Sequence, residues 1–161
     1  RDNNPVMFVE SQIMYNVKGV VPLEEYLIPL GKADVKRVGD RVSIVTWGPM
    51  LYEALKAADM LAEQGVSAEV VDIRSLVPLD METILASVRK TGRCVVASHA
   101  VGIGSFTGEI AARIMAEAFD YLDAPVLRVG AKDGIAPQAY TLEDAFLPHD
   151  RDLVAAVRQL L

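Results

Sequence analysis

The sequence predicts an α/β fold, a three-layer sandwich whose mainly parallel sheet carries one antiparallel edge strand. The first observation behind this prediction is that short β-branched runs alternate with longer helical patterns. Parallel strands joined in this way need right-handed helical crossovers, which cover both faces of the sheet. The second is the turn Val38-Gly39-Asp40 between the β-rich residues 33–37 and 42–47, which is typical of an antiparallel hairpin.

Capping residues mark the ends of the expected helices. Pro49 begins the first helix and Gly65 follows its end, whereas Asp80 caps the second helix and Gly92 closes it. A third helix around residues 108–119 follows a glycine-rich loop. The other expected elements are strands over 68–73, 93–98 and 125–129, and a final helix that Asp150 caps and that buries Leu153, Val154, Val157, Leu160 and Leu161.

The beginning of the chain does not fit this regular domain. Residues 5–10 (PVMFVE) are typical of a buried strand, but residues 11–31 contain two prolines, two glycines and no periodic pattern. An unstructured segment of about 20 residues is uncommon inside one compact domain. We therefore expect residues 5–10 to belong to a different structural unit from the rest of the chain.

The composition predicts a soluble, intracellular, acidic domain. Of the 161 residues, 52% are hydrophobic and 24% are charged, and the formal net charge is −6. This charge disfavours binding to a nucleic-acid backbone, because phosphate contacts require a surplus of Lys and Arg. The sequence contains no apolar run of the roughly 18 residues that a membrane span needs. Its polar start, Arg1-Asp2-Asn3-Asn4, is unlike a signal peptide.

Two features near the expected carboxyl ends of strands are candidates for ligand binding. The loop Gly102-Ile103-Gly104-Ser105-Phe106-Thr107-Gly108 either cradles a phosphate at a helix N-terminus or forms a tight turn. Its third glycine comes one residue too late for the dinucleotide-binding pattern, so the turn is the favoured interpretation. His99 is either an acid, base or anion contact, or an interface or structural residue.

The remaining candidates give no complete catalytic site. Cys94 lies within an expected strand, where a small buried thiol is the default interpretation. The acidic pairs Glu24-Glu25 and Glu143-Asp144 are typical of solvated surface, and no acidic residues show metal-ligand spacing. From the residues alone we assign no catalytic, cofactor-binding or metal-binding residue.

Five stretches resemble consecutive parts of one known family. They are PVMFVESQIMYNVKGVVP, YLIPLGKADVKRVGDRVSIVTWG, EVVDIRSLVPLDMETILASVRKTGR, GEIAARIMAEAFDYLDAPVLRVG and LEDAFLPHDRDLVAAVRQLL. In the residues of these stretches, and in their order and spacing, the chain is similar to one family. That family is the β subunit of the thiamine-diphosphate-dependent decarboxylating component of 2-oxo acid dehydrogenase complexes, of the pyruvate or branched-chain type. The resemblance covers essentially all 161 residues.

The resemblance implies the C-terminal portion of a longer subunit. Residues 1–11 would end a preceding pyrimidine-binding domain, residues 12–31 would form a linker arm, and residues 32–161 would be a transketolase C-terminal-like domain. The parent enzyme would use thiamine diphosphate and Mg²⁺ to decarboxylate a 2-oxo acid oxidatively, with acyl transfer to lipoyl groups. The family's residues for this chemistry lie upstream, so none is carried over to this chain.

The resemblance also implies partners: the α subunit, a second β subunit and the subunit-binding domain of a dihydrolipoyl acyltransferase. Asp123 matches the family's acidic docking residue, and Leu160 and Leu161 lie near that docking surface. His99 and Phe106 are possible interface residues, although the acid that ends this strand in many members is missing here. We expect a cytoplasmic protein, or one of the mitochondrial or plastid matrix in a eukaryote.

An alternative function belongs to a different class. A freestanding α/β module would bind a protein partner, or a small ligand at residues 102–108 and His99, without catalysis. A complete short reading frame would favour this module, whereas upstream coding sequence would favour the longer subunit.

Overall fold

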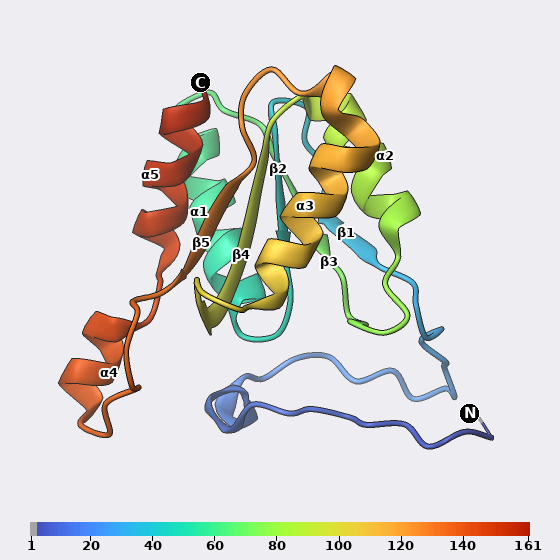
Figure 1. The fold of residues 1–161 in the computed structure, drawn as a ribbon. Helices are drawn as coiled ribbons and strands as arrows, with labels where there is room; N and C mark the ends of the chain where they lie inside the picture. The colour runs from blue at the N-terminus through green and yellow to red at the C-terminus, as the bar shows by residue number, and fades with distance from the viewer. Residues whose placement is uncertain (1–2) are drawn as a thin grey trace.

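The computed structural model describes residues 3–161, and these contain a five-stranded sheet with the order β1-β3-β2-β4-β5 (Figure 1). The strands are β1 (Asp34–Arg37), β2 (Val42–Thr46), β3 (Ala68–Asp72), β4 (Cys94–Val101) and β5 (Leu127–Ala131). β2 is parallel to β3 and β4, β4 is parallel to β5, and β1 is antiparallel to β3. The predicted fold class, with its antiparallel edge strand, is confirmed.

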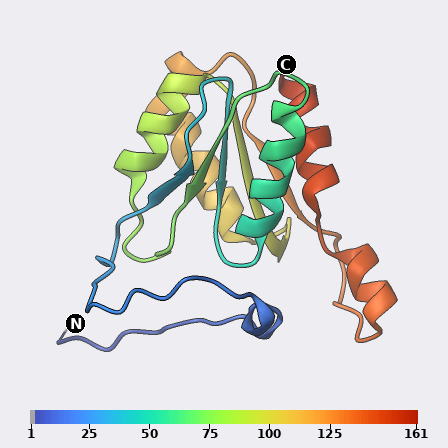
Figure 2. The same ribbon diagram turned by 180° about the vertical axis from the view of Figure 1, so that it is seen from behind.

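Helices cover both faces of this sheet, as Figures 1 and 2 show. α1 (Met50–Ala62) and α5 (Asp150–Leu160) pack on one face, and α2 (Met81–Thr91) and α3 (Phe106–Ala118) pack on the other. Three further elements are short: α4 (Tyr140–Phe146) and the 3-10 helices η1 (Gln12–Asn16) and η2 (Phe119–Tyr121). We call the two borders of the sheet, where the parallel strands begin and end, the amino edge and the carboxyl edge.

The core has two layers, one on each face of the sheet, and every residue of the central strand β2 is buried between them. Ile44 faces the layer of α1 and α5, which contains Leu153. Val45 faces the other way, towards Ile84 of α2 and Ile114 of α3. Burial on both faces explains why this central parallel strand is apolar along most of its length rather than alternating.

The prediction that the first two strands pair with each other as a hairpin is wrong. β3 lies between β1 and β2, the two strands that the turn connects. The turn crosses the start of β3, where the amides of Asp40 and Arg41 donate to the carbonyl of Ser67 (3.3 and 2.9 Å). A Cβ atom on Gly39 would lie 2.3 Å from the backbone of Ala68, so this crossing requires glycine.

The predicted ends of α2 are confirmed. Asp80 caps the helix, because its carboxylate accepts hydrogen bonds from the Thr83 amide (3.3 Å) and hydroxyl (2.8 Å). Gly92 closes the helix in the left-handed conformation, with a φ of 68°. Asp80 also accepts a hydrogen bond from the amide of Ala33 (3.0 Å), which ties the chain before β1 to the domain.

The N-terminal arm, residues 3–31, leaves the domain at its carboxyl edge, as Figures 1 and 2 show. Residues 5–10 are exposed and irregular, so the predicted strand is not formed here. A strand needs a neighbour for its backbone hydrogen bonds, and the sheet in the described part of the chain does not extend to this segment. That residues 5–10 belong to a preceding domain stays a prediction. Arg1 and Asp2, from the polar start, lie outside the described residues.

The end of the chain differs from prediction in two details. The residue that caps α5 is His149 rather than Asp150, and the His149 amide donates to the carboxylate of Asp152 (2.8 Å). Leu160 is buried as expected, whereas Leu161 follows the helix and is 50% exposed. Among residues 3–161, no helix has both the length and the apolar character needed to cross a membrane.

Candidate functional site

The amino edge carries a charged corner built around Arg93. The guanidinium Nη1 of Arg93 lies 3.0 Å from Oδ2 of Asp123, and Nε donates a hydrogen bond to the carbonyl of Leu160 (2.8 Å). One side chain therefore joins the turn after η2 to the last residue of α5. We call these three residues, together with Leu161, the amino-edge corner.

The backbone holds Asp123 against the end of α2. The amide of Asp123 donates a hydrogen bond to the carbonyl of Gly92 (2.8 Å). A Cβ atom on Gly92 would lie 2.7 Å from Oδ2 of Asp123, so this close approach also depends on glycine. Nearby, the guanidinium of Arg89 lies 5.4 Å from the centre of the Tyr121 ring, a cation–π arrangement. The corner therefore combines a fixed backbone contact with a side-chain ion pair.

The predicted docking residues differ in exposure. The side chain of Asp123 is 59% exposed, and Leu161 is half exposed, whereas Leu160 belongs to the core. Through its carbonyl, however, Leu160 is held by the same guanidinium as Asp123. The structure thus brings Asp123 and Leu160 together and leaves the Asp123 carboxylate accessible.

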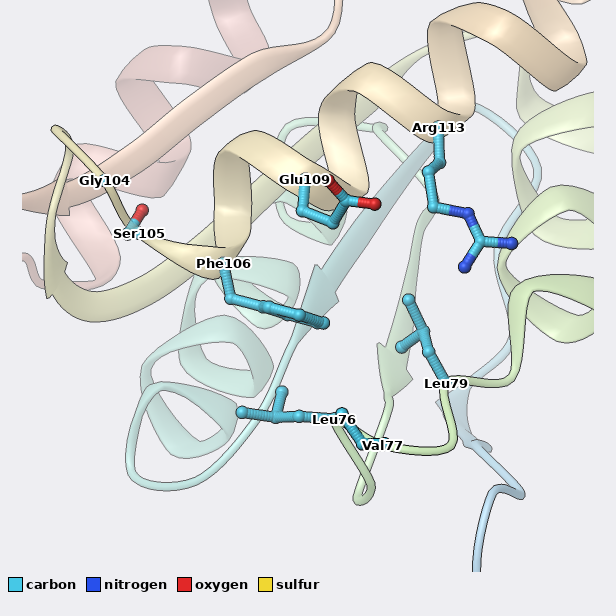
Figure 3. A pocket seen from close by; sticks show the side chains of 8 residues that line it. All are labelled: Leu76, Val77, Leu79, Gly104, Ser105, Phe106, Glu109 and Arg113. Carbon is cyan, nitrogen blue, oxygen red and sulfur yellow. The ribbon is translucent and has the colours of Figure 1, made fainter.

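The opposite, carboxyl edge carries an open hollow of about 550 Å³ (Figure 3). It is lined from the β3–α2 connection by Leu76, Val77 and Leu79, and from α3 and the preceding loop by Gly104, Ser105, Phe106, Glu109 and Arg113. In Figure 3 the side chains of Phe106 and Leu76 face one another across this hollow. Phe106 also meets Trp47 edge-on, with ring centroids 6.3 Å apart. This possible interface residue therefore both packs inside the domain and borders open apolar surface.

His99 lies near the C-terminal end of β4, at the same edge. Its Nε2 atom is buried without a hydrogen-bond partner among residues 3–161. Burial lowers the pKa of His99, the Glu53 carboxylate opposes this shift, and His149 adds to it. Glu53 links α1 to the start of α5, since its carboxylate accepts a hydrogen bond from the amide of Asp150 (3.0 Å) and lies 3.9 Å from Nδ1 of His149. The lowered pKa favours the uncharged form of His99, which disfavours its use as an anion contact.

The glycine-rich loop forms a tight turn. Gly104 has a φ of 70°, and the carbonyl of Gly102 accepts hydrogen bonds from Arg128 (3.0 Å) and from the Ser105 hydroxyl (3.4 Å). Glu109 lies in the first turn of α3, where its charge would repel a bound anion. The geometry thus favours the turn over a phosphate cradle.

The other sequence candidates remain outside any reactive cluster. Cys94 is completely buried, and burial raises the pKa of its thiol to about 12, so it stays protonated at neutral pH. The pairs Glu24-Glu25 and Glu143-Asp144 lie on exposed surface. Within the described part of the chain, no group of three or more His, Cys, Asp or Glu side chains is placed to hold a metal ion.

Sequence reasoning missed Arg93 and Glu53, the residues that organise the two edges. A signal for Arg93 was present, because a lone charged residue stands between a helix-ending glycine and an apolar strand. Glu53 pairs locally with Lys56, but the contacts that join separate elements, Arg93 with Leu160 and Glu53 with Asp150, link residues far apart along the chain. No local pattern reports such contacts.

Residues 31–153 match the protein family described as "Transketolase, C-terminal domain". The chain belongs to this family. The match covers the whole sheet, the helices from α1 to α4 and the first turn of α5, so it accounts for the fold described above.

Relatives in this family extend the match to the arm. The pyruvate dehydrogenase E1 component subunit beta of Bacillus subtilis is 47% identical over 100% of this chain and 50% of the relative. The 2-oxoisovalerate dehydrogenase subunit beta of the same species is 41% identical over 99% of this chain and 50% of the relative. The resemblance to β subunits of 2-oxo acid dehydrogenases is confirmed, and the chain spans about half the length of these relatives.

Solved structures agree with this assignment. A structure titled "Split gene transketolase, inactive beta4 tetramer" matches with a TM-score of 0.73 and 34% identity, covering 89% of this chain and 46% of the other. A 2-oxoglutarate:ferredoxin oxidoreductase from Magnetococcus marinus matches with a TM-score of 0.55 and 17% identity, covering 80% of this chain and 19% of the other. The second likeness concerns the fold alone.

Proposed function

We propose that this chain is the C-terminal part of a 2-oxo acid dehydrogenase β subunit and that it serves subunit assembly and docking to the acyltransferase core. The parent enzyme would decarboxylate a 2-oxo acid oxidatively and transfer the acyl group to a lipoyl group. The supporting observation is 47% identity along the whole chain to a pyruvate dehydrogenase β subunit of about twice its length. Relatives named for pyruvate, acetoin and 2-oxoisovalerate are similarly close, so the proposal names no single substrate.

Thiamine diphosphate and Mg²⁺ are the cofactors of the proposed parent enzyme. The residues described here do not fit them: residues 3–161 hold no cluster of metal-ligating side chains. The glycine-rich loop presents the Gly102 carbonyl to Arg128 and carries Glu109 in the following helical turn. We therefore assign both cofactors to parts of the parent enzyme outside this chain. The proposed location is the cytoplasm, or the mitochondrial or plastid matrix of a eukaryote.

The carboxyl edge supports the assembly role. Val77 is 86% exposed and Ile103 is 77% exposed, and the nearby arm exposes large apolar residues such as Leu23. Contiguous exposed apolar surface is typical of a protein interface. The α subunit and a second β subunit are the partners that we propose for this edge.

The amino-edge corner supports the docking role. Its exposed Asp123 carboxylate offers an anion to a basic partner, and the subunit-binding domain of the acyltransferase is the partner that the proposal names. Asp123 stands on a short turn whose backbone is fixed by Gly92. Little chain reorganisation is then needed on binding, which favours affinity.

Calorimetric titration of the 161-residue chain with the acyltransferase subunit-binding domain of the same genome tests docking. Asp123→Asn should weaken binding about tenfold or more, because the partner's cation loses a charged acceptor. Asp59→Asn is the control. Asp59 of α1 is also an exposed aspartate that pairs with an arginine, Arg37 of β1, but this pair is not part of the amino-edge corner. No loss with Asp123→Asn, or an equal loss with both variants, would contradict the docking role.

A freestanding ligand-binding module is the second candidate, and the hollow beside Phe106 is the observation that favours it. The intact mass of the natural polypeptide, compared with its reading frame, separates the two candidates. A mass near 17.5 kDa from a complete frame supports the module. A longer frame that encodes an upstream half supports the β subunit.

A further inference from the structure

We propose that Arg93 is the positioning residue of the amino-edge corner: it fixes Asp123 and the C-terminal end of α5 as one preassembled site for a cationic group of a protein partner. This inference rests on the proposed docking role of Asp123 and names the residue that orients it. Arg93 itself is only 21% exposed, so it lies behind the carboxylate rather than on the surface that a partner meets.

The guanidinium serves two segments at once. Nη1 holds Oδ2 of Asp123, and Nε holds the carbonyl of Leu160. The last carbonyls of a helix lack partners within the helix, and a cation near them is also favoured by the helix dipole. Arg93 therefore fixes the residue from which Leu161 extends, and the same guanidinium orients Asp123.

The ion pair leaves part of the Asp123 carboxylate available. The contact with Arg93 uses Oδ2, and a carboxylate accepts about four hydrogen bonds through its two oxygens. A partner cation can therefore share the carboxylate without displacing Arg93. Because Arg93 already orders the aspartate side chain, the conformational entropy of that side chain is not lost on binding.

Two effects of Arg93 on a cationic partner have opposite signs. Its positive charge repels the partner and weakens binding, whereas its hold on Asp123 and Leu160 preorganises the site and strengthens binding. The Asp123 carboxylate lies between the partner's cation and Arg93, and solvent at this surface screens the repulsion between the two positive charges. We therefore expect preorganisation to dominate. Removing the Arg93 charge should therefore weaken binding if preorganisation dominates and strengthen binding if repulsion dominates.

The geometry also distinguishes arginine from lysine. A guanidinium is a planar fork whose separate N–H groups reach two acceptors in fixed directions, whereas an ammonium is a single point charge. Arg93→Lys keeps the charge but loses the simultaneous hold on Asp123 and Leu160. Arg93→Gln loses both the charge and the fork.

Titration with the same subunit-binding domain tests these variants. Arg93→Gln and Arg93→Lys should each weaken binding about fivefold to tenfold, which corresponds to roughly 1–1.4 kcal/mol. Arg37→Gln is the matched control, because Arg37 also pairs with an exposed aspartate but lies in β1, and it should change binding less than about twofold. Thermal unfolding confirms that each variant is folded. If Arg93→Gln does not fold, Arg93→Lys carries the comparison.

A double-mutant cycle separates positioning from other roles. In the Asp123→Asn background, Arg93→Gln should cost less than about half of its effect in the wild type, since most of that effect passes through Asp123. An undiminished effect would overturn the inference, because Arg93 would then act independently of Asp123. Tighter or unchanged binding by Arg93→Gln would also overturn it, while the loss with Asp123→Asn would keep the docking role intact. If Asp123→Asn itself has no effect, the docking role fails first.

Discussion

The two edges of the sheet meet their surroundings in different ways. At the amino edge, charged groups are paired: Arg93 holds Asp123, and Lys90 holds the buried carboxylate of Glu69. At the carboxyl edge, Val77 is exposed and the buried Nε2 of His99 has no partner among residues 3–161. An edge with satisfied polar groups is stable in water by itself, whereas an edge of exposed apolar groups is completed by another protein surface. Under the proposed function, this difference would suit the amino edge to reversible docking and the carboxyl edge to lasting assembly.

The largest expected effect of a single substitution is at the carboxyl edge. Asp80→Ala removes the cap of α2 and also the acceptor for the Ala33 amide, a hydrogen bond that ties the chain before β1 to the domain. We expect the free energy of unfolding to fall by about 2–3 kcal/mol, the sum of a lost cap and an unsatisfied amide. Urea denaturation measures this change. Glu82→Ala is the control, because Glu82 lies in the same helical turn with its side chain 89% exposed. A loss no larger than that of Glu82→Ala would show that the cap does not stabilise this edge.

An intermediate effect is expected at the amino edge. Gly92→Ala forces alanine into a positive φ and brings its Cβ against Asp123. Gly65→Ala is matched to it, since Gly65 has a φ of 78° and no atom near the added Cβ. Both variants should lose about 1–2 kcal/mol of unfolding free energy from the backbone conformation. Gly92→Ala alone should also weaken docking of the subunit-binding domain. Equal docking by both variants would show that the position of Asp123 is not set by Gly92.

The smallest expected effect is the pH dependence of the carboxyl edge. Burial lowers the pKa of His99 below its ordinary value of 6.5, so below that pH the unfolded chain binds a proton that the folded chain does not. The free energy of unfolding should therefore fall as the pH drops from 7 to 5. Denaturation of wild type and of His99→Gln at several pH values measures the difference. A parallel pH dependence of the two proteins would exclude His99 as its source.

Local chemistry made much of the fold predictable from the sequence. The cap at Asp80 and the left-handed closure at Gly92 depend on residues within one helix, and both were predicted correctly. The pairing of β1 was not, because the chain from 38 to 41 looks like a hairpin turn but passes over β3. Which strand lies beside β1 is decided by a segment about 30 residues further along, and no local pattern contains it.

The site was predictable only in part, and for the same reason. Resemblance to a family pointed to Asp123 and Leu160, and the structure places both on one guanidinium. Arg93 was treated as the first residue of a strand, since nothing near it in sequence shows a partner. Leu161 was expected inside α5 because it continues the apolar pattern, but the helix ends at Leu160. Leu161 lies past the last residue of α5, where the helical pattern no longer applies, so periodicity overestimated its burial.

Hydrogen exchange of the 161-residue chain, with and without the acyltransferase subunit-binding domain, tests the central claim most directly. Docking at the amino edge predicts slower exchange of the Asp123 amide and of the last turn of α5. It also predicts unchanged exchange at residues 76–79 and 103–106, which lie at the carboxyl edge. Protection confined to the carboxyl edge, with none at Asp123, would contradict the account.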